Sequence, residues 1–225
     1  MHDVPDSFRD LSLEAFIDRL ASSEPVPGGG SASAVAASLA AGLVAMVAGL
    51  SRGRPALASH DDLHVEAGSV ARALADRFLT LAQEDATAYG AFAAARRLPR
   101  ATDEERAARV AAMHGAARLA SEVPLRCVEA CREILVEAER LAGRCNMNCS
   151  SDLRVAALLT EAAARGAAEN VLVNLPSIDD QGWAAEAAGR VEVLLAEIER
   201  LSAATRNVVA SGATREPIAT GSGAR

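Results

Sequence analysis

Hydrophobic residues recur at helical spacing along almost the whole chain. Between residues 11 and 21, for example, Leu13, Phe16, Ile17 and Leu20 fall on one helical face. No segment alternates apolar and polar residues as a half-buried strand would. The pattern therefore predicts an all-α protein, with helices over residues 11–21, 30–50, 59–97, 102 to about 143, 150–174 and from 177 onward.

Local signals indicate where several of these helices begin or bend. Thr102 and Glu105 have the spacing of a capping box, which marks the start of the helix from residue 102 to about 143. Pro124 lies inside this helix and is expected to kink or split it. Serines are the expected N-caps of three other helices: Ser12, then Ser31 or Ser33, and finally Ser150 or Ser151.

The composition restricts both the core and the partners. Half of the 225 residues are hydrophobic but only 3% are aromatic, so the core must be built from Ala, Leu and Val. The net charge of -7 argues against a nucleic-acid or anionic-membrane surface. The polar, acidic beginning has no signal-peptide pattern, so we expect a cytoplasmic protein.

These features predict one domain rather than several. We expect a single-domain multi-helix bundle of long, Ala-rich antiparallel helices over residues 11–208. A flexible N-terminus is expected at residues 1–10, and a disordered tail rich in Gly, Ser and Thr at residues 209–225.

The apolar segment 30–50 is about long enough to cross a bilayer. Its many Ala, Gly and Ser residues contribute little transfer free energy, however, and Leu39, Leu43, Val47 and Leu50 repeat at helical spacing. The sequence therefore favours a buried bundle helix over a membrane span.

The four cysteines form two pairs, Cys127 with Cys131 and Cys145 with Cys149. Because residues four apart share a helical face, a four-thiolate metal site is conceivable. Zinc and iron–sulfur modules usually place their cysteines on turns at shorter spacing. Free, half-buried thiols in a reducing compartment are the favoured interpretation, and we predict no metal site.

Several polar clusters stand out from the Ala-rich background. The segment Gly28–Ser31 opens the apolar helix, where unpaired N–H groups attract anions, although a helix entry without a ligand is the alternative. Cys145–Asp152 combines two amides, two hydroxyls and a carboxylate, which either bind a ligand or cap a helix. Asn170 and Asn174 lie one turn apart on a helix, and Glu84-Asp85 is a weaker candidate in mid-helix.

Together these segments resemble the cyclodeaminase/cyclohydrolase family, which includes bacterial methenyltetrahydrofolate cyclohydrolases and the cyclodeaminase domain of formiminotransferase-cyclodeaminase. The resemblance covers about residues 10–205. It rests on the order of six motifs: PxPGGG at 25–30, EDxxxY at 84–89, LP at 98–99, EVPL at 122–125, NxNxxSD at 146–152 and NVxVN at 170–174. It implies an all-helical bundle, commonly a homodimer, with a folate site and neither metal nor organic coenzyme.

The sequence departs from the family pattern after the apolar helix. Relatives often show a glycine followed by two or three lysines and a tyrosine, whereas here Gly53 is followed by Arg54 and Pro55, so that Arg52 and Arg54 are the only cations. Cys145 also stands where a glycine is usual. The family assignment survives these changes, which leave the substrate open.

The resemblance implies a methenyltetrahydrofolate cyclohydrolase, which hydrolyses 5,10-methenyltetrahydrofolate to 10-formyltetrahydrofolate. We expect Asp152 to deprotonate the attacking water and Asp85 to act as a second carboxylate or orienter. Amides suit the pterin edge, and arginines or helix N–H groups suit the glutamate carboxylates. The expected substrate contacts are Gly28, Gly29, Gly30, Ser31, Arg52, Arg54, Asn146, Asn148, Ser151, Asn170 and Asn174.

Other functions stay open. A formiminotetrahydrofolate cyclodeaminase would use the same acid–base pair without an attacking water and release ammonia, but in relatives it often accompanies a formiminotransferase domain, which this sequence does not contain. The altered loop at residues 52–57 also fits a non-folate amidine or imine as substrate, or a non-catalytic binding or dimerisation protein.

Overall fold

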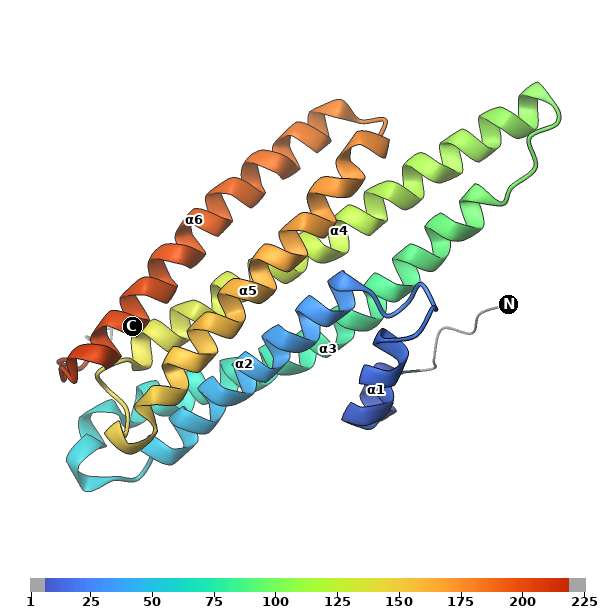
Figure 1. The fold of residues 1–225 in the computed structure, drawn as a ribbon. Helices are drawn as coiled ribbons and strands as arrows, with labels where there is room; N and C mark the ends of the chain where they lie inside the picture. The colour runs from blue at the N-terminus through green and yellow to red at the C-terminus, as the bar shows by residue number, and fades with distance from the viewer. Residues whose placement is uncertain (1–6, 219–225) are drawn as a thin grey trace, which may run out of the picture.

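A computed structural model describes residues 7–218 (Figure 1). These residues form α1 (Leu13–Leu20), α2 (Gly29–Ser51), α3 (Asp61–Arg96), α4 (Asp103–Leu141), α5 (Ser150–Asn174) and α6 (Gln181–Ser211). Short 3-10 turns lie at Phe8–Asp10, Pro55–His60, Met147–Cys149 and Leu175–Ser177, and residues 7–218 contain no strand. The all-α prediction is confirmed.

Helices α2 to α6 lie side by side as an elongated bundle, and α2 is antiparallel to both α3 and α5 (Figure 1). The N-terminal end of α2 lies beside Asp85 of α3 and Asn170 of α5. Its C-terminal end lies beside Gly68 of α3 and Asn146, just before α5. Sequence motifs that follow one another along the chain are thereby sorted to the two ends of α2.

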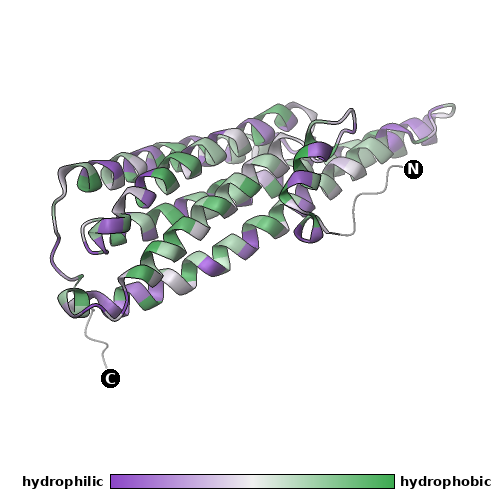
Figure 2. Ribbon diagram, turned by 60° about the horizontal axis from the view of Figure 1, so that its bottom comes forward, coloured by the Kyte–Doolittle hydropathy of each residue, from purple (hydrophilic) through white to green (hydrophobic). Residues whose placement is uncertain are grey.

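The core depends on small side chains. Alanine is the best helix former, and its single methyl group allows neighbouring helices to approach closely. On α2 the apolar residues with no exposed surface are Ala37, Ala40, Ala41, Val44, Val47 and Ala48. Figure 2 shows hydrophilic residues gathered instead at the turn between α3 and α4, which projects beyond the other helices.

Among residues 7–218, α2 is the one helix long and apolar enough to cross a membrane. In the structure 44% of its most apolar window is buried, because α3 and α5 flank it along its length. Helix α2 is therefore a member of the bundle with one face left uncovered.

The predicted helix N-termini are only partly correct. The capping box of Thr102 and the cap of α1 by Ser12 are both present. The expected serine caps of α2 and α5 are wrong, because Gly28 and Cys149 occupy the cap positions without a side-chain hydrogen bond. The hydroxyl of Ser31 donates across to α3 instead.

Two further expectations about helix boundaries need correction. Helix α4 runs unbroken through Pro124, so the chain is not split there. Helix α6 begins at Gln181, capped by Asp180, because Pro176 lies in a separate 3-10 turn.

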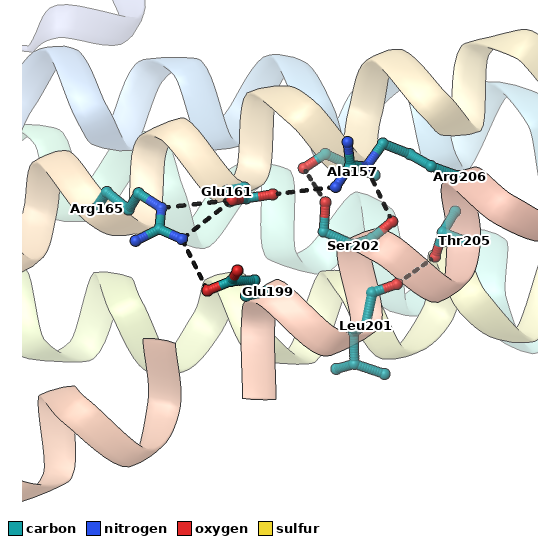
Figure 3. Close-up of polar contacts among 8 residues, drawn as sticks. All are labelled: Ala157, Glu161, Arg165, Glu199, Leu201, Ser202, Thr205 and Arg206. Carbon is teal, nitrogen blue, oxygen red and sulfur yellow. Dashed lines mark hydrogen bonds and ion pairs between the residues drawn. The ribbon is translucent and has the colours of Figure 1, made fainter. Parts of the chain in front are cut away.

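Helix α6 is attached to α5 by charged and hydroxyl side chains (Figure 3). Arg165 of α5 reaches both Glu161 on its own helix and Glu199 of α6. Ser202 of α6 is buried and donates a hydrogen bond to the carbonyl of Ala157. These contacts lie on the side of α5 that faces away from α2.

Within the described residues, the two ends that the sequence predicts to be flexible contact the bundle. Helix α6 includes residues 209–211, and Arg215 then forms an ion pair of 2.7 Å with Glu139 and donates its backbone N–H to the carbonyl of Gly143. At the other end Phe8 is buried against Phe16. The remaining parts of these two predictions, residues 1–6 and 219–225, lie outside the described residues.

Candidate functional site

A cavity of about 290 Å³ lies at the N-terminal end of α2, bounded by α3, α4 and α5. Three of the sequence motifs meet in it: the glycines of residues 28–30, the carboxylate of Asp85 and the two asparagines near the end of α5. Its lining residues are Pro25, Val26, Gly28, Gly29, Gly30, Asp85, Tyr89, Phe92, Ala120, Asn170 and Asn174.

The carboxyl group of Asp85 packs directly against the backbone of Gly30. A Cβ atom on Gly30 would lie 2.1 Å from Oδ1 of Asp85, so no other residue fits there without displacing the carboxyl group. The first turn of a helix carries unpaired N–H groups and the positive end of the helix dipole. The glycine therefore lets a negative charge reach the end of α2 that favours it.

Ser31 contacts the same carboxyl group from within the helix. It is fully buried, and its Oγ lies 2.9 Å from both Oδ2 of Asp85 and the carbonyl oxygen of Ala82. A hydroxyl has one proton to donate. When Asp85 is ionised, that proton goes to the carboxylate. When Asp85 is protonated, the carboxyl group donates to Oγ and the hydroxyl donates to Ala82, so Ser31 can hydrogen-bond to both states.

Burial in the cavity raises the pKa of Asp85, and the hydrogen bonds from the side chain and backbone of Ser31 lower it by less. The pKa of this carboxyl group therefore lies above its ordinary value. A carboxyl group with a raised pKa in a cavity is suited to accepting a proton and returning it.

Asn174 is positioned by a defect in α4. Pro124 lacks an N–H, so it makes no helical hydrogen bond to the carbonyl of Ala120 four residues earlier. Nδ2 of Asn174 donates to that carbonyl at 3.1 Å. The proline that was expected to interrupt the helix thus provides an anchor for a cavity residue.

The two asparagines present their amide oxygens as acceptors. Nδ2 of Asn174 also donates to the carbonyl of Asn170 at 2.8 Å, and Nδ2 of Asn170 donates to the carbonyl of Gly166 at 2.8 Å. With their NH2 groups used in this way, neither amide oxygen has a donor within residues 7–218. Both oxygens are therefore available to hydrogen-bond donors of a ligand.

The other half of the predicted site lies at the opposite end of α2. Arg52 and Arg54 follow this helix, and Asn146, Asn148, Ser151 and Asp152 surround the start of α5. Helix α2 has 23 residues, which corresponds to about 34 Å. Within one chain, Asp152 therefore does not meet Asp85, and the expectation that the two carboxylates act together fails for a single protomer.

Asn146 connects the elements at this second end. Its backbone N–H donates to Oγ of Ser51 at 2.9 Å, its Nδ2 donates to the carbonyl of Leu50 at 3.4 Å, and its Oδ1 accepts from the N–H of Asn148 at 3.2 Å. Its hydrogen-bonding groups are thus used inside the protein, in a role that the sequence pattern does not reveal.

The two arginines at the second end of α2 form no ion pair within residues 7–218. Nε of Arg54 donates to the carbonyl of Leu50 at 2.9 Å, and neither Arg52 nor Arg54 has an acidic partner within residues 7–218. Arg54 and Asp152 both act on the thiol of Cys149: burial and Asp152 raise its pKa, and Arg54 lowers it. Both charged side chains therefore lie near Cys149.

The cysteines are buried and free. Burial raises the pKa of Cys145 to about 12 and that of Cys131 well above its ordinary value, so both thiols are protonated at neutral pH. Within residues 7–218, no three side chains among His, Cys, Asp and Glu come together as metal ligands would.

Two aromatic residues that line the cavity, Tyr89 and Phe92, are not among the site residues predicted from the sequence. Both follow Asp85 on α3 at spacings of four and seven residues, which places them on the same helical face. That spacing is the signal that could have found them.

Several known proteins resemble this chain in sequence or in structure. The family profile described as formiminotransferase-cyclodeaminase matches residues 12–193. A methenyltetrahydrofolate cyclohydrolase of Methylorubrum extorquens is 38% identical over 191 residues, which are 85% of this chain and 92% of that protein. The formimidoyltransferase-cyclodeaminases of Gallus gallus and Rattus norvegicus are each 34% identical, over 85% and 89% of this chain.

The chain spans only 35% and 38% of those two vertebrate proteins. Among solved structures, the formiminotetrahydrofolate cyclodeaminase of Thermotoga maritima superposes with a TM-score of 0.82 at 25% identity. That superposition covers 90% of this chain and 98% of the Thermotoga chain.

Replacing Ser31 tests the contact between the hydroxyl and the carboxyl group. Because the hydrogen bonds of Ser31 favour the ionised form of Asp85, Ser31→Ala should raise the pKa of Asp85 further above its ordinary value. The measurement is a carboxyl carbon NMR titration of aspartate-labelled protein, with Asp85→Asn to assign the resonance. An unchanged or lower midpoint in Ser31→Ala would show that the hydroxyl does not donate to this carboxylate.

Proposed function

The chain belongs to the formiminotransferase-cyclodeaminase family, and we propose that it is a methenyltetrahydrofolate cyclohydrolase whose active site is the cavity at the N-terminal end of α2. The observation that carries this proposal is the half-buried carboxyl group of Asp85, held between Gly30 and Ser31 with a raised pKa. Similarity along 92% of a cyclohydrolase favours that activity over the others found in the family.

The substrate is a cation that suits this cavity. Methenyltetrahydrofolate carries its positive charge on an amidinium bridge between N5 and N10. Asp85 is the one ionisable carboxyl group that lines the cavity, and no arginine lines it among the described residues. A carboxylate without a neighbouring cation attracts the bridge and at the same time serves as a base toward water.

The reaction needs one group that moves protons in two steps. Asp85 accepts a proton as the oxygen of water bonds to the bridging carbon, which gives a neutral tetrahedral intermediate. The bond from this carbon to N5 then breaks, N5 receives the proton held by Asp85, and the hydroxyl loses its proton as the formyl group forms. One proton is released overall, and the product is 10-formyltetrahydrofolate.

We therefore assign the role of base to Asp85 rather than to Asp152, which the sequence pattern favoured. The reason is position, because Asp152 lies at the other end of α2. Ser31 can stay hydrogen-bonded to Asp85 through both steps, since it bonds to either protonation state. Ser31 acts here as a positioning residue.

The remaining cavity residues suit the pterin ring. Its N3–H and amino groups are donors, and the amide oxygens of Asn170 and Asn174 are acceptors at the cavity wall. Tyr89 and Phe92 offer aromatic surface for the flat ring. With four free, buried thiols, we also place the enzyme in a reducing compartment, the cytoplasm.

A second candidate is formiminotetrahydrofolate cyclodeaminase, favoured by the similarity to the Thermotoga maritima structure. In that reaction N10 attacks the formimino carbon and ammonia leaves. Asp85 would then accept the proton from N10 and return it to the departing nitrogen, with no attacking water. The two reactions share the cavity and differ in the nucleophile.

The absorbance of the methenyl bridge in the near ultraviolet tests the cyclohydrolase directly. Purified wild-type protein should accelerate its decay in proportion to enzyme concentration, measured against the buffer-only rate. Asp85→Asn should lower kcat by about a hundredfold or more with little change in thermal unfolding, because the base is lost and the shape is kept.

Two other outcomes would change the assigned role of Asp85 or the assigned activity. A raised KM at unchanged kcat in Asp85→Asn would mean that this carboxylate only binds substrate. Wild-type protein that leaves the methenyl absorbance unchanged but releases ammonia from formiminotetrahydrofolate would replace the cyclohydrolase with the cyclodeaminase.

Gly30→Ala tests whether the close approach of the carboxyl group matters. The added methyl group has no room beside Oδ1 of Asp85, so it should displace the carboxyl group and lower kcat by about tenfold or more. Gly189→Ala in α6 is the matched control, because its Cβ meets nothing within 4 Å and both positions are helical. Equal activity of the two variants would remove the contact with Gly30 from the mechanism.

A further inference from the structure

Helix α5 contains a glycine that the mechanism above does not use. Gly166 lies well inside this helix, one turn before Asn170. A glycine inside a helix lowers helix stability relative to alanine, so its presence points to a requirement of packing. The neighbouring helix shows what that requirement is. A Cβ atom on Gly166 would lie 2.5 Å from Oγ of Ser33 on α2, closer than a Cβ atom approaches another atom.

The hydroxyl of Ser33 occupies the space that a side chain at position 166 would need. Its Oγ donates a hydrogen bond of 2.8 Å to the carbonyl of Gly29, one turn earlier on α2. The Cβ atom of Ser33 would lie 3.6 Å from a Cβ atom at position 166, which is an ordinary contact. The approach of the two helices at this point is therefore limited by a single oxygen atom, which a hydrogen bond holds in place.

A second contact between α2 and α5 lies one turn away, at the cavity. A Cβ atom on Gly29 would lie 3.5 Å from Nδ2 and 3.9 Å from Oδ1 of Asn170. Nδ2 of Asn170 in turn donates to the carbonyl of Gly166 at 2.8 Å. Because the two helices are antiparallel, the contact of Gly29 with Asn170 and that of Ser33 with Gly166 are neighbours. These four residues form a closed ring of contacts across the two helices.

The hydrogen bond to Gly166 determines which way the amide of Asn170 points. If the amide turned over, its oxygen would face the carbonyl oxygen of Gly166, and neither atom has a proton to donate. The NH2 group therefore stays on the helix, and Oδ1 stays available at the cavity wall. A ligand gains a hydrogen bond from this oxygen only if the ligand offers a donor.

We propose that Gly166 and Ser33 are positioning residues that act through Asn170 to determine which ligands the cavity accepts. Their contact sets the spacing between α5 and α2, and thereby the distance from the amide oxygen to the carboxyl group of Asp85. A ligand must then place a donor at Asn170 and its reacting carbon at Asp85 at the same time. This inference rests on the proposed function, in which the donors are the N3–H and amino groups of a pterin.

Gly166→Ala tests the contact with Ser33. The added methyl group has no room beside Oγ, and Oγ is held by its hydrogen bond, so α5 should move away from α2. The hydrogen bond from a bound pterin to Asn170 is then lost, and affinity should fall about tenfold. The measurement is a calorimetric titration with 5-formyltetrahydrofolate, which has the pterin edge but no methenyl bridge to hydrolyse.

A rescue variant separates this role from a general effect of alanine in the helix. Ser33→Ala removes the oxygen that meets the new methyl group and keeps the Cβ atom at its ordinary distance. Gly166→Ala combined with Ser33→Ala should therefore bind within about twofold of Ser33→Ala alone. Gly189→Ala in α6 is the matched glycine control, because its Cβ meets nothing within 4 Å, and it should bind like the wild type.

A second ligand gives a readout that a purely structural role would not change. The probe is 5-formyltetrahydrofolate with hydrogen in place of the amino group on its pterin. The wild type should bind the parent compound about tenfold more tightly than this probe, and Gly166→Ala should reduce that ratio toward one. A loss of affinity for both compounds by the same factor would mean that Gly166 only supports the fold, which contradicts the proposal.

The side-chain NH2 resonance of Asn170 tests the geometry without any ligand. In protein labelled with asparagine, and with Asn170→Ala to assign the resonance, Gly166→Ala should shift this signal. The double variant should return it to its position in Ser33→Ala. Wild-type affinity of Gly166→Ala, or a double variant that binds as weakly as Gly166→Ala, would overturn the proposal. Wild-type protein that binds no folate would refute the proposed function, whereas the response of the resonance would still support the positioning of Asn170 by Gly166.

Discussion

The contact between the carboxyl group of Asp85 and the backbone of Gly30 determines how the site is organised. A carboxyl group can reach the first turn of α2 only where that turn has no side chain, and Gly30 provides this opening. The same contact takes the carboxyl group out of water, which raises its pKa, and brings it within 2.9 Å of Ser31. This one contact thus requires a glycine at position 30 and places the carboxyl group at a helix end that favours negative charge. It also raises the pKa of the carboxyl group.

Irregularities of the helices supply the rest of the cavity. Pro124 leaves the carbonyl of Ala120 without its helical partner, and Asn174 uses that carbonyl as an anchor. The alanines that fill much of the core of this bundle offer no side-chain hydrogen bond. The polar groups of the cavity are therefore held where a helix begins or where its ladder of hydrogen bonds is incomplete.

Much of the fold can be predicted from the sequence, because helical periodicity and the Thr102 capping box depend on residues close together in the chain. The cap of α2 could not be predicted, since the bond from Ser31 to α3 depends on a neighbour 54 residues away. The same holds for the role of Pro124, which requires α5 to lie beside α4. For the site, the motifs supplied the candidate residues, and only the antiparallel path of α2 shows that these candidates fall into two groups.

The most direct test of this account is a crystal structure with a bound tetrahydrofolate analogue that carries a stable bridge between N5 and N10. The account predicts that the bridging carbon lies against Asp85, with the pterin edge at Asn170 and Asn174. An analogue bound among Asn146, Asn148 and Asp152 of one chain, with the cavity beside Gly30 empty, would contradict it.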